Sequence, residues 1–373
     1  AYVPGMTIVD CNDDINIAMR GVYSNGQEKI LIMLNGHRMN SYCTNTAAPD
    51  FSMSLEKIKQ IEVLRGPASS LYGGVALTAV VNLITKQGVD VDGVEATVGF
   101  GNYGQLRGNI LFGKRYYDID IMAWGSLYKA KGQKQHVKEE KLIQGNYEGD
   151  VTIGGVGDKP SFELGLQLKW GDVRFMYDTH FSQIISPYTM GYLHTPYDID
   201  AYNTYNGFRP SFATQSHHAD LSYQHRFNKL NLSGAIRYDN GDLTHYQVIS
   251  DSILPAFTTL VGLNNNPTFA FLDSIPGLSR YINGQEQTIQ GQLQADLNYV
   301  SKNLNKGTLT FGAEYIHYRL EDARYLLGFN FTQGFESSTL SEFGKGTENS
   351  FNTFLQLKHH WRSFIINAGM RYD

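Results

Sequence analysis

The sequence lacks several features that would each point to a familiar class of protein. It has no uninterrupted apolar run of the ~18 residues that a membrane-spanning helix needs, so no such helix is predicted. It has no basic excess, with 31 Lys and Arg against 36 Asp and Glu, so a nucleic-acid partner is not expected. Only two cysteines are present, Cys11 and Cys43, which either pair in an oxidising compartment or stay as separate thiols. No secretory signal stands at the N-terminus, which fits a cytoplasmic protein or a trimmed chain, and we favour the trimmed chain.

Motifs of enzyme chemistry are scarce as well. The chain has no nucleophile elbow and no His–Glu metal motif. The glycine-rich stretch GFGNYG at 99–104 suits a β-hairpin better than the strand-to-helix loop that cradles phosphate. We therefore expect a protein that is not an enzyme and that carries no cofactor and no bound metal ion.

The first 90 residues have the pattern of a small mixed α/β unit. Short apolar runs at 30–34, 61–64 and 80–84 predict three strands, of which the first is expected to be buried. Ser54 is expected to cap a short helix over 55–60.

After residue 93 the apolar residues follow a period of two. Across 288–300, for example, Ile289 and Leu293 alternate with Gln290 and Gln294. The same alternation marks about eleven segments, many of them close to the length of a tilted membrane strand. A soluble β-sandwich would show the same alternation, so the strands alone do not choose between the two.

The connections between these segments alternate in length. Short ones are expected near 113–116, 171–172, 227–229, 301–307 and 360–363, and long ones near 129–160, 185–216, 249–285 and 322–349. Outer-membrane barrels have tight turns on the periplasmic side and long loops outside, whereas a sandwich has no reason to keep this parity. Aromatic residues at strand ends, such as Trp170, Tyr299 and Trp361, also suit the girdles of a membrane barrel. The pattern therefore favours the barrel.

A family resemblance supports this interpretation. Residues 61–86, IEVLRGPASSLYGGVALTAVVNLITK, resemble the C-terminal signature of the plug domain in TonB-dependent outer-membrane receptors. Residues 17–21 resemble the plug's "IRG" strand, 30–40 its next strand and turn, and 3–6 the "PGV" segment that precedes them. The match covers residues 3–115, and beyond that only the strand pattern is shared.

The resemblance implies an all-β transmembrane antiparallel barrel, here about eleven of an expected 22 strands, preceded by a small α/β plug. We expect the C-terminal part of the plug over 1–90 and the N-terminal half of the barrel over 91–373. Measured against the family, we expect the chain to lack the energy-coupling TonB box and about half of the barrel. The resemblance also implies a multi-pass β-barrel protein of the cell outer membrane.

The function that the resemblance implies is import of a metal chelate, most of all a ferric siderophore, by plug rearrangement driven through TonB and its inner-membrane energising complex. The resemblance at Arg65-Gly66-Pro67 favours the subgroup for ferric siderophores, haem, cobalamin or metal chelates, because polysaccharide importers of the family carry a Lys-Asp type turn there. A haem or cobalamin receptor is the alternative within the family, and a passive porin the alternative outside it. Further partners would be outer-membrane lipid and, in some receptors, a surface lipoprotein.

Ligand contacts are expected at the plug apex and in one aromatic loop, at Asn40, Tyr42, Asn45, Tyr188, Tyr192, Tyr197, Tyr202 and Tyr205. The tyrosines could instead anchor the loop at the membrane interface.

Two further sets of residues follow from the resemblance. A lock between plug and barrel is expected at Arg20, Glu62 and Arg65, which could equally be solvated surface charges. Axial ligands to haem iron could come from His37, His180, His194, His217 and His218, although their spacing fits no tight metal motif. His217 and His218 are adjacent, so on a strand their side chains point to opposite faces.

Overall fold

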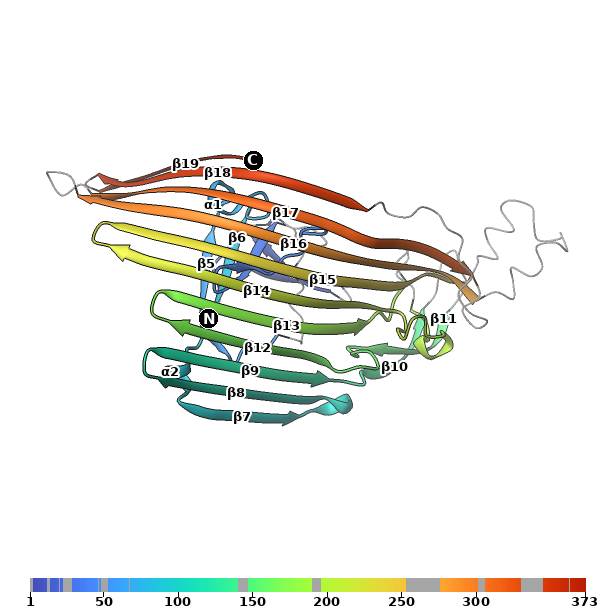
Figure 1. Cartoon of the computed structure of the whole chain (residues 1–373). Helices are drawn as coiled ribbons and strands as arrows, with labels where there is room; N and C mark the ends of the chain where they lie inside the picture. The colour runs from blue at the N-terminus through green and yellow to red at the C-terminus, as the bar shows by residue number, and fades with distance from the viewer. Residues whose placement is uncertain are drawn as a thin grey trace.

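The computed structural model describes residues 3–11, 14–19, 21–22, 29–45, 47, 53–66, 68–139, 147–189, 196–252, 276–300, 306–329, 345–361 and 363–373. They form a small sheet and a large sheet, which lie face to face (Figure 1). Within these ranges, no helix has the length and apolar character required to span a membrane.

The small sheet forms the centre of the predicted plug. Its order is β4 (His37–Arg38), β3 (Ile30–Leu34), β6 (Ala79–Thr85) and β5 (Ile58–Arg65), with β3 and β6 parallel. The apolar run of β3 is buried along its whole length, and it ends at a turn in which Asn35 and Gly36 both have positive φ. Around the sheet lie the hairpin β1 (Met6–Cys11) and β2 (Asp14–Met19), and the short helices α1 (Ser69–Tyr72) and α2 (Gly88–Val91).

The helix expected over 55–60 is wrong. Residues from Ile58 onward belong to β5, which pairs antiparallel with β6. The Ser54 hydroxyl does accept the backbone N–H of Glu56, as a helix cap would, but this bond closes only a turn. Pairing with β6 satisfies more backbone groups than a short isolated helix could.

The large sheet contains eleven antiparallel strands, as the alternation predicts. They are β7 (Gly93–Phe100), β8 (Leu106–Tyr116), β9 (Ile119–Lys129), β12 (Ser161–Trp170), β13 (Val173–Ile185), β14 (Ser211–Phe227), β15 (Leu230–Ser252), β16 (Pro276–Val300), β17 (Lys306–Phe329), β18 (Gly346–Trp361) and β19 (Phe364–Tyr372). Each pairs with its neighbour in chain order, except that β9 pairs with β12. The tight turns at 117–118, 171–172 and 228–229 lie at one end of the sheet, whereas the short connection between β7 and β8 lies at the other end, where the long connections after β9 and β13 begin (Figure 1).

The predicted long connections are partly structured. The one near 129–160 contains a separate hairpin, β10 (Gln133–Glu139) with β11 (Tyr147–Ile153). The next contains the 3-10 turn Ile199–Ala201, and another 3-10 turn, Asn102–Gly104, joins β7 to β8. Strands β15, β16 and β17 are 23, 25 and 24 residues long, and so extend well past the ~9–11 residues that cross a bilayer.

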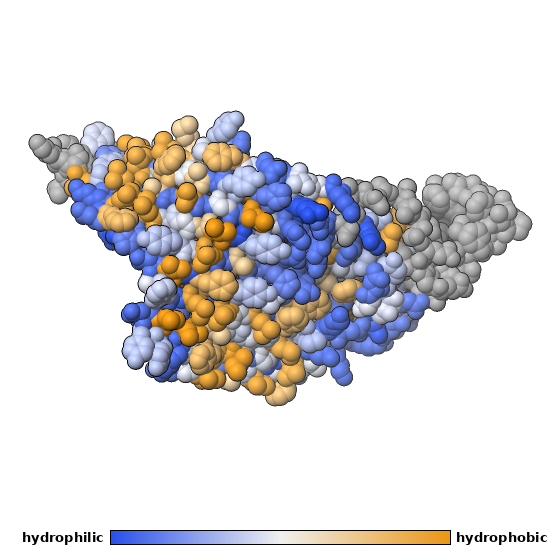
Figure 2. Space-filling view, viewed as in Figure 1, coloured by the Kyte–Doolittle hydropathy of each residue, from blue (hydrophilic) through white to orange (hydrophobic). Residues whose placement is uncertain are grey.

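The faces of the large sheet are reversed relative to a soluble protein. On the face away from the plug, Leu293 is 70% exposed and Ile236 is 64% exposed, whereas Glu163 and Asp220 on the plug-facing side are fully buried. Figure 2 shows the apolar side chains gathered over the part of the strands nearer the tight turns. A sandwich would bury its apolar face, so this arrangement is that of a membrane barrel.

The outward face gives a direct test of this orientation. We expect Leu293→Arg to destabilise the folded protein in lipid vesicles by about 2–4 kcal/mol, because a charge would face hydrocarbon. The matched control is Gln294→Arg at the next position, whose side chain points inward and bonds to Asp296. Urea unfolding of both variants in vesicles measures the difference, and an equal loss in the two would contradict the assigned faces.

The plug packs against the inward face through an apolar core. Ile30, Ile32 and Leu34 of β3 form one buried cluster with Trp124 and Met176 of the large sheet. This cluster places β3 of the plug against strands β8, β9 and β13 of the large sheet.

Candidate functional site

A buried ion cluster joins the plug to the large sheet at His37. This residue follows the tight turn after β3 and is fully buried. Its Nε2 lies 2.6 Å from Asp239 Oδ1, and its Nδ1 lies 3.8 Å from Asp220 Oδ2. Asp220 also pairs with Arg237 at 3.0 Å and with Arg174 at 3.4 Å. The plug thus contributes one imidazole to a charged site that strands β13, β14 and β15 build.

The charge of His37 is set by these neighbours. Burial by itself would lower the pKa of His37, but the carboxylates of Asp239 and Asp220 outweigh burial and raise the pKa to about 9. His37 is therefore an imidazolium at neutral pH and donates a charge-assisted hydrogen bond to Asp239.

A second buried cluster surrounds Lys57. Its Nζ contacts Glu163 and lies 3.8 Å from Asp178, and all three side chains are fully buried. Trp124 donates its Nε1–H to Asp178 at 3.0 Å, and its ring lies 5.2 Å from the ammonium. Burial lowers the pKa of Lys57 to about 8, although the negative charge of Asp178 acts to raise it. The second carboxylate oxygen of Glu163 accepts the backbone N–H of Ser54 at 2.9 Å.

Two further contacts hold the ends of the plug against the sheet. Asp120 accepts the backbone N–H groups of Gly88 at 2.6 Å and Val89 at 3.1 Å, where the chain passes from plug to sheet. Near the other edge, Arg371 donates to Glu314 at 2.7 Å and to a carbonyl of the plug at 3.3 Å.

The residues predicted to form the lock lie elsewhere. Arg20 lies outside the described residues. Glu62 accepts a bond from Asn82 at 3.1 Å, and Arg65 donates to the carbonyl of Pro4 at 3.4 Å, so both bond within the plug. Both are exposed, and in the described part of the chain neither bonds to the large sheet. Their locking role stays a prediction, while the contacts that the structure shows come from His37 and Lys57.

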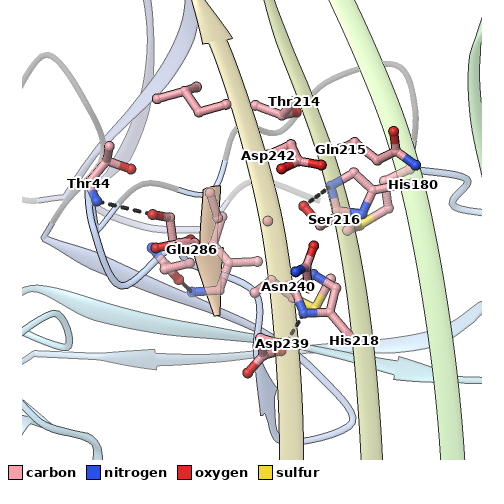
Figure 3. Close-up of a pocket in the computed structure, with 18 of the residues that line it drawn as sticks. Thr44, His180, Thr214, Gln215, Ser216, His218, Asp239, Asn240, Asp242 and Glu286 are labelled. Carbon is pink, nitrogen blue, oxygen red and sulfur yellow. Dashed lines mark hydrogen bonds and ion pairs between the residues drawn. The ribbon is translucent and has the colours of Figure 1, made fainter. Parts of the chain in front are cut away.

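A cavity of ≈ 550 Å³ lies between the plug apex and the large sheet (Figure 3). The apex lines it with Met39, Asn40, Ser41, Tyr42, Cys43 and Thr44. The sheet lines it chiefly from β14, β15 and β16, with polar residues that include Ser216, His218, Asp239 and Glu286. These positions lie toward the long-connection end, beyond the outward apolar band.

The apex loop over 41–45 is held in place by the sheet and by the plug. Glu286 accepts the backbone N–H of Cys43 at 2.8 Å, and the Tyr42 hydroxyl donates to Gln290 at 3.5 Å. Cys43 is an exposed free thiol, so the disulfide between Cys11 and Cys43 is not formed.

The predicted contact residues of the apex have different places. Tyr42 lines the cavity with its ring. Asn40 also lines it, but its amide is used internally, since it accepts from Ile32 N–H at 2.7 Å and donates to the carbonyls of Ile30 and Asn45. Asn45 accepts from Arg38 at 2.8 Å and is not among the lining residues. Contact with a ligand stays a prediction for all three apex residues.

The predicted tyrosines of the loop near 185–216 gather in a cluster of their own. Tyr197 and Tyr202 are buried with ring centroids 5.1 Å apart, and they pack with Tyr246 and Tyr281 of the sheet. Tyr205 packs against the same cluster. Tyr188 and Pro196 form an isolated antiparallel β-bridge, and Tyr192 lies outside the described residues. The cluster folds the loop over the strands, and a ligand role for these tyrosines stays a prediction.

Residues 1–80 match the family described as TonB-dependent Receptor Plug Domain. The iron-regulated outer membrane virulence protein of Vibrio cholerae is 38% identical over 91 residues, which cover 23% of this chain and 14% of that protein. The vitamin B12 transporter BtuB of Photobacterium profundum is 34% identical over 130 residues, which cover 34% of this chain and 20% of that protein.

Solved structures share the fold over nearly the whole chain. The unliganded ferric citrate transporter FecA superposes with a TM-score of 0.65 at 13% identity, covering 99% of this chain and 52% of that chain. A mutant of the ferric enterobactin receptor PfeA from Pseudomonas aeruginosa gives 0.60 at 15% identity, covering 99% and 53%. The chain thus spans about half the length of these receptors. Residues 1–80 therefore resemble the plug domain of TonB-dependent receptors, and nearly the whole chain shares the fold of these solved outer-membrane receptors.

Proposed function

We propose that the whole protein imports a metal chelate, in particular a ferric siderophore, by a plug rearrangement that TonB and its inner-membrane energising complex drive. One observation carries this proposal: the cavity is bounded by the plug apex on one side and by inward polar side chains of the sheet on the other. A ligand that fills it would contact both parts at once, so binding would alter how the apex is held.

The domain division goes with this proposal. We place the boundary between plug and barrel near residue 90, between α2 and the start of β7 at Gly93. On this division the apex loop belongs to the plug and the remaining cavity wall to the barrel.

Three alternative functions differ in the observations that favour or disfavour them. A cobalamin receptor is favoured by the likeness to BtuB, and a haem receptor would use His180 and His218 in the cavity wall. A passive porin is disfavoured because residues 1–80 match a plug domain, which the buried clusters of His37 and Lys57 join to the large sheet.

Uptake by the full-length gene tests the proposal. A host strain without receptors of its own would be given radio-iron catecholate, citrate and hydroxamate chelates, haem and cyanocobalamin, each with and without TonB. We expect saturable uptake of one iron chelate that falls to background without TonB. Saturable uptake of haem or cobalamin alone would move the assignment to that ligand, and uptake that persists without TonB would favour the porin.

A further inference from the structure

Three side chains with metal-binding chemistry converge at the floor of the cavity, where the plug meets the sheet. They are His37 after β3, His218 on β14 and Asp239 on β15, and one ligand atom from each lies within 4.8 Å of the others. Both imidazoles bond to the same oxygen, Asp239 Oδ1, each at 2.6 Å. The two histidines are buried and Asp239 is mostly buried.

The surroundings of the two imidazoles favour ligation over simple hydrogen bonding. Two nitrogen donors share one carboxylate oxygen, while His37 Nδ1 and His218 Nε2 are buried and make no hydrogen bond to any residue that the structure describes. His37 Nδ1 faces Asp220 at 3.8 Å, and two arginines hold that carboxylate in place. A carboxylate behind the second ring nitrogen is the usual support of a metal-binding histidine, because it fixes the orientation and the tautomer of the ring.

We propose that His37, His218 and Asp239 bind a divalent first-row transition ion such as Zn²⁺. Two imidazoles and one carboxylate suit Zn²⁺ and its neighbours, whereas Ca²⁺ and Mg²⁺ prefer oxygen ligands throughout. His218 and Asp239 line the cavity (Figure 3). A fourth coordination position on that side of the ion would be open to water or to a donor atom of a bound ligand.

The distances allow such an ion with small movements. Bonds of ~2.0–2.1 Å in tetrahedral geometry place the ligand atoms about 3.3 Å apart. The two nitrogen–oxygen distances are now 2.6 Å, so each must open by roughly 0.7 Å, while the two ligand nitrogens, which lie within 4.8 Å of each other, must approach to about 3.3 Å. The ion would take the place of the protons that lie between these atoms, since the ligand nitrogens must be unprotonated.

One bound ion would connect the plug to two neighbouring barrel strands. His37 belongs to the plug, while His218 and Asp239 are directly paired residues of β14 and β15. The ion would therefore hold the plug to the wall at the floor of the cavity, within reach of whatever fills the cavity. This inference does not depend on which chelate the protein imports.

Direct metal titration of the full-length protein tests the proposal. The protein in detergent, stripped with a chelator, would be titrated with Zn²⁺ by calorimetry at pH 8 and with Co²⁺ by visible absorption. We expect one equivalent to bind, with the intense Co²⁺ bands of tetrahedral coordination. We expect His218→Gln to weaken binding at least tenfold, on the order of the loss seen when support around a metal site is removed.

The neighbouring histidine provides a matched control. His217 lies on the same strand with its side chain on the other face, where its Nδ1 lies 2.9 Å from the Tyr177 hydroxyl. His217→Gln should bind like the parent protein. If His218→Gln fails to fold, His37→Asn changes the site from the plug side and should show the same loss.

The outcomes are distinct from those of the uptake assay. A folded parent protein without saturable binding, or an equal loss in His217→Gln, would overturn the metal site. Uptake of a chelate by a protein that binds no ion would leave the proposed function in place and remove this inference alone. Metal binding by a protein that takes up no chelate would support the metal site and contradict the proposed function.

Discussion

Lys57→Met is expected to destabilise the folded protein by about 3–5 kcal/mol, which is the usual effect of removing one partner from a buried ion pair. The ammonium neutralises Glu163 and Asp178, and all three side chains are fully buried. Methionine fills a similar volume but leaves both carboxylates in a dry site. The plug should therefore separate from the sheet at a lower denaturant concentration.

Lys59→Met is the matched control for this change. Lys59 lies two residues further along the chain, within β5, its side chain is 54% exposed, and it pairs with Asp90 at 2.7 Å. An exposed pair of this kind contributes only ~0–1 kcal/mol. Unfolding of both variants in detergent, followed by circular dichroism, gives the comparison. A loss for Lys57→Met no larger than that for Lys59→Met would contradict a buried charge cluster.

A combined variant separates charge from packing. Adding Glu163→Gln and Asp178→Asn to Lys57→Met removes the uncompensated charges while it keeps the size of the side chains. We expect much of the lost stability to return, because buried ion pairs are often replaced by neutral groups at little cost. No recovery would show that the uncompensated charges of Glu163 and Asp178 are not the cause of the loss.

The strands could be predicted from the sequence because lipid enforces a strict alternation. Leu293 and Gln294 face opposite environments, and every strand in the bilayer repeats that contrast. The signal ends where a strand leaves the membrane and both faces meet water. Residues 239–242 of β15 are all polar or glycine, so the alternation stops there. The sequence therefore gives no clear boundary for the end of this strand, which it places near residue 249.

The ion clusters were missed because their members are distant in the sequence. His37 and Asp239 are 202 positions apart, so no motif spacing reveals them. One signal was nevertheless available. The tight turn at 228–229 sets the register of β14 and β15, and that register pairs His218 with Asp239 and Asp220 with Arg237. Adjacent opposite charges on the inward face would then have indicated the site from the sequence alone. Only the position of the plug against these strands could not be predicted without the structure.

Arg38→Gln is expected to weaken ligand binding by about 10- to 30-fold while leaving the fold intact. The guanidinium donates to the carbonyls of Asn40 and Ser41 and to the side chain of Asn45, and it lies 3.9 Å from the Tyr42 ring centre. These bonds order the apex loop that forms one wall of the cavity. Losing roughly 1.4–2 kcal/mol of the free energy that orders this loop reduces the fraction of molecules in which the wall is formed. The apparent affinity for the ligand falls with that fraction.

The native thiol of Cys43 reports on this loop without a ligand. A spin label on Cys43, in a Cys11→Ser background, should become more mobile in Arg38→Gln. Arg38→Lys should not restore the order, because a lysine ammonium cannot reproduce the fork of bonds made by the guanidinium. Arg107→Gln is the control, since Arg107 lines the cavity but pairs with the exposed Glu56 at 2.8 Å. Equal label mobility in Arg38→Gln and Arg107→Gln would mean that the apex is held by Glu286 and Gln290 of the barrel instead, and the plug would then sense the ligand through the sheet.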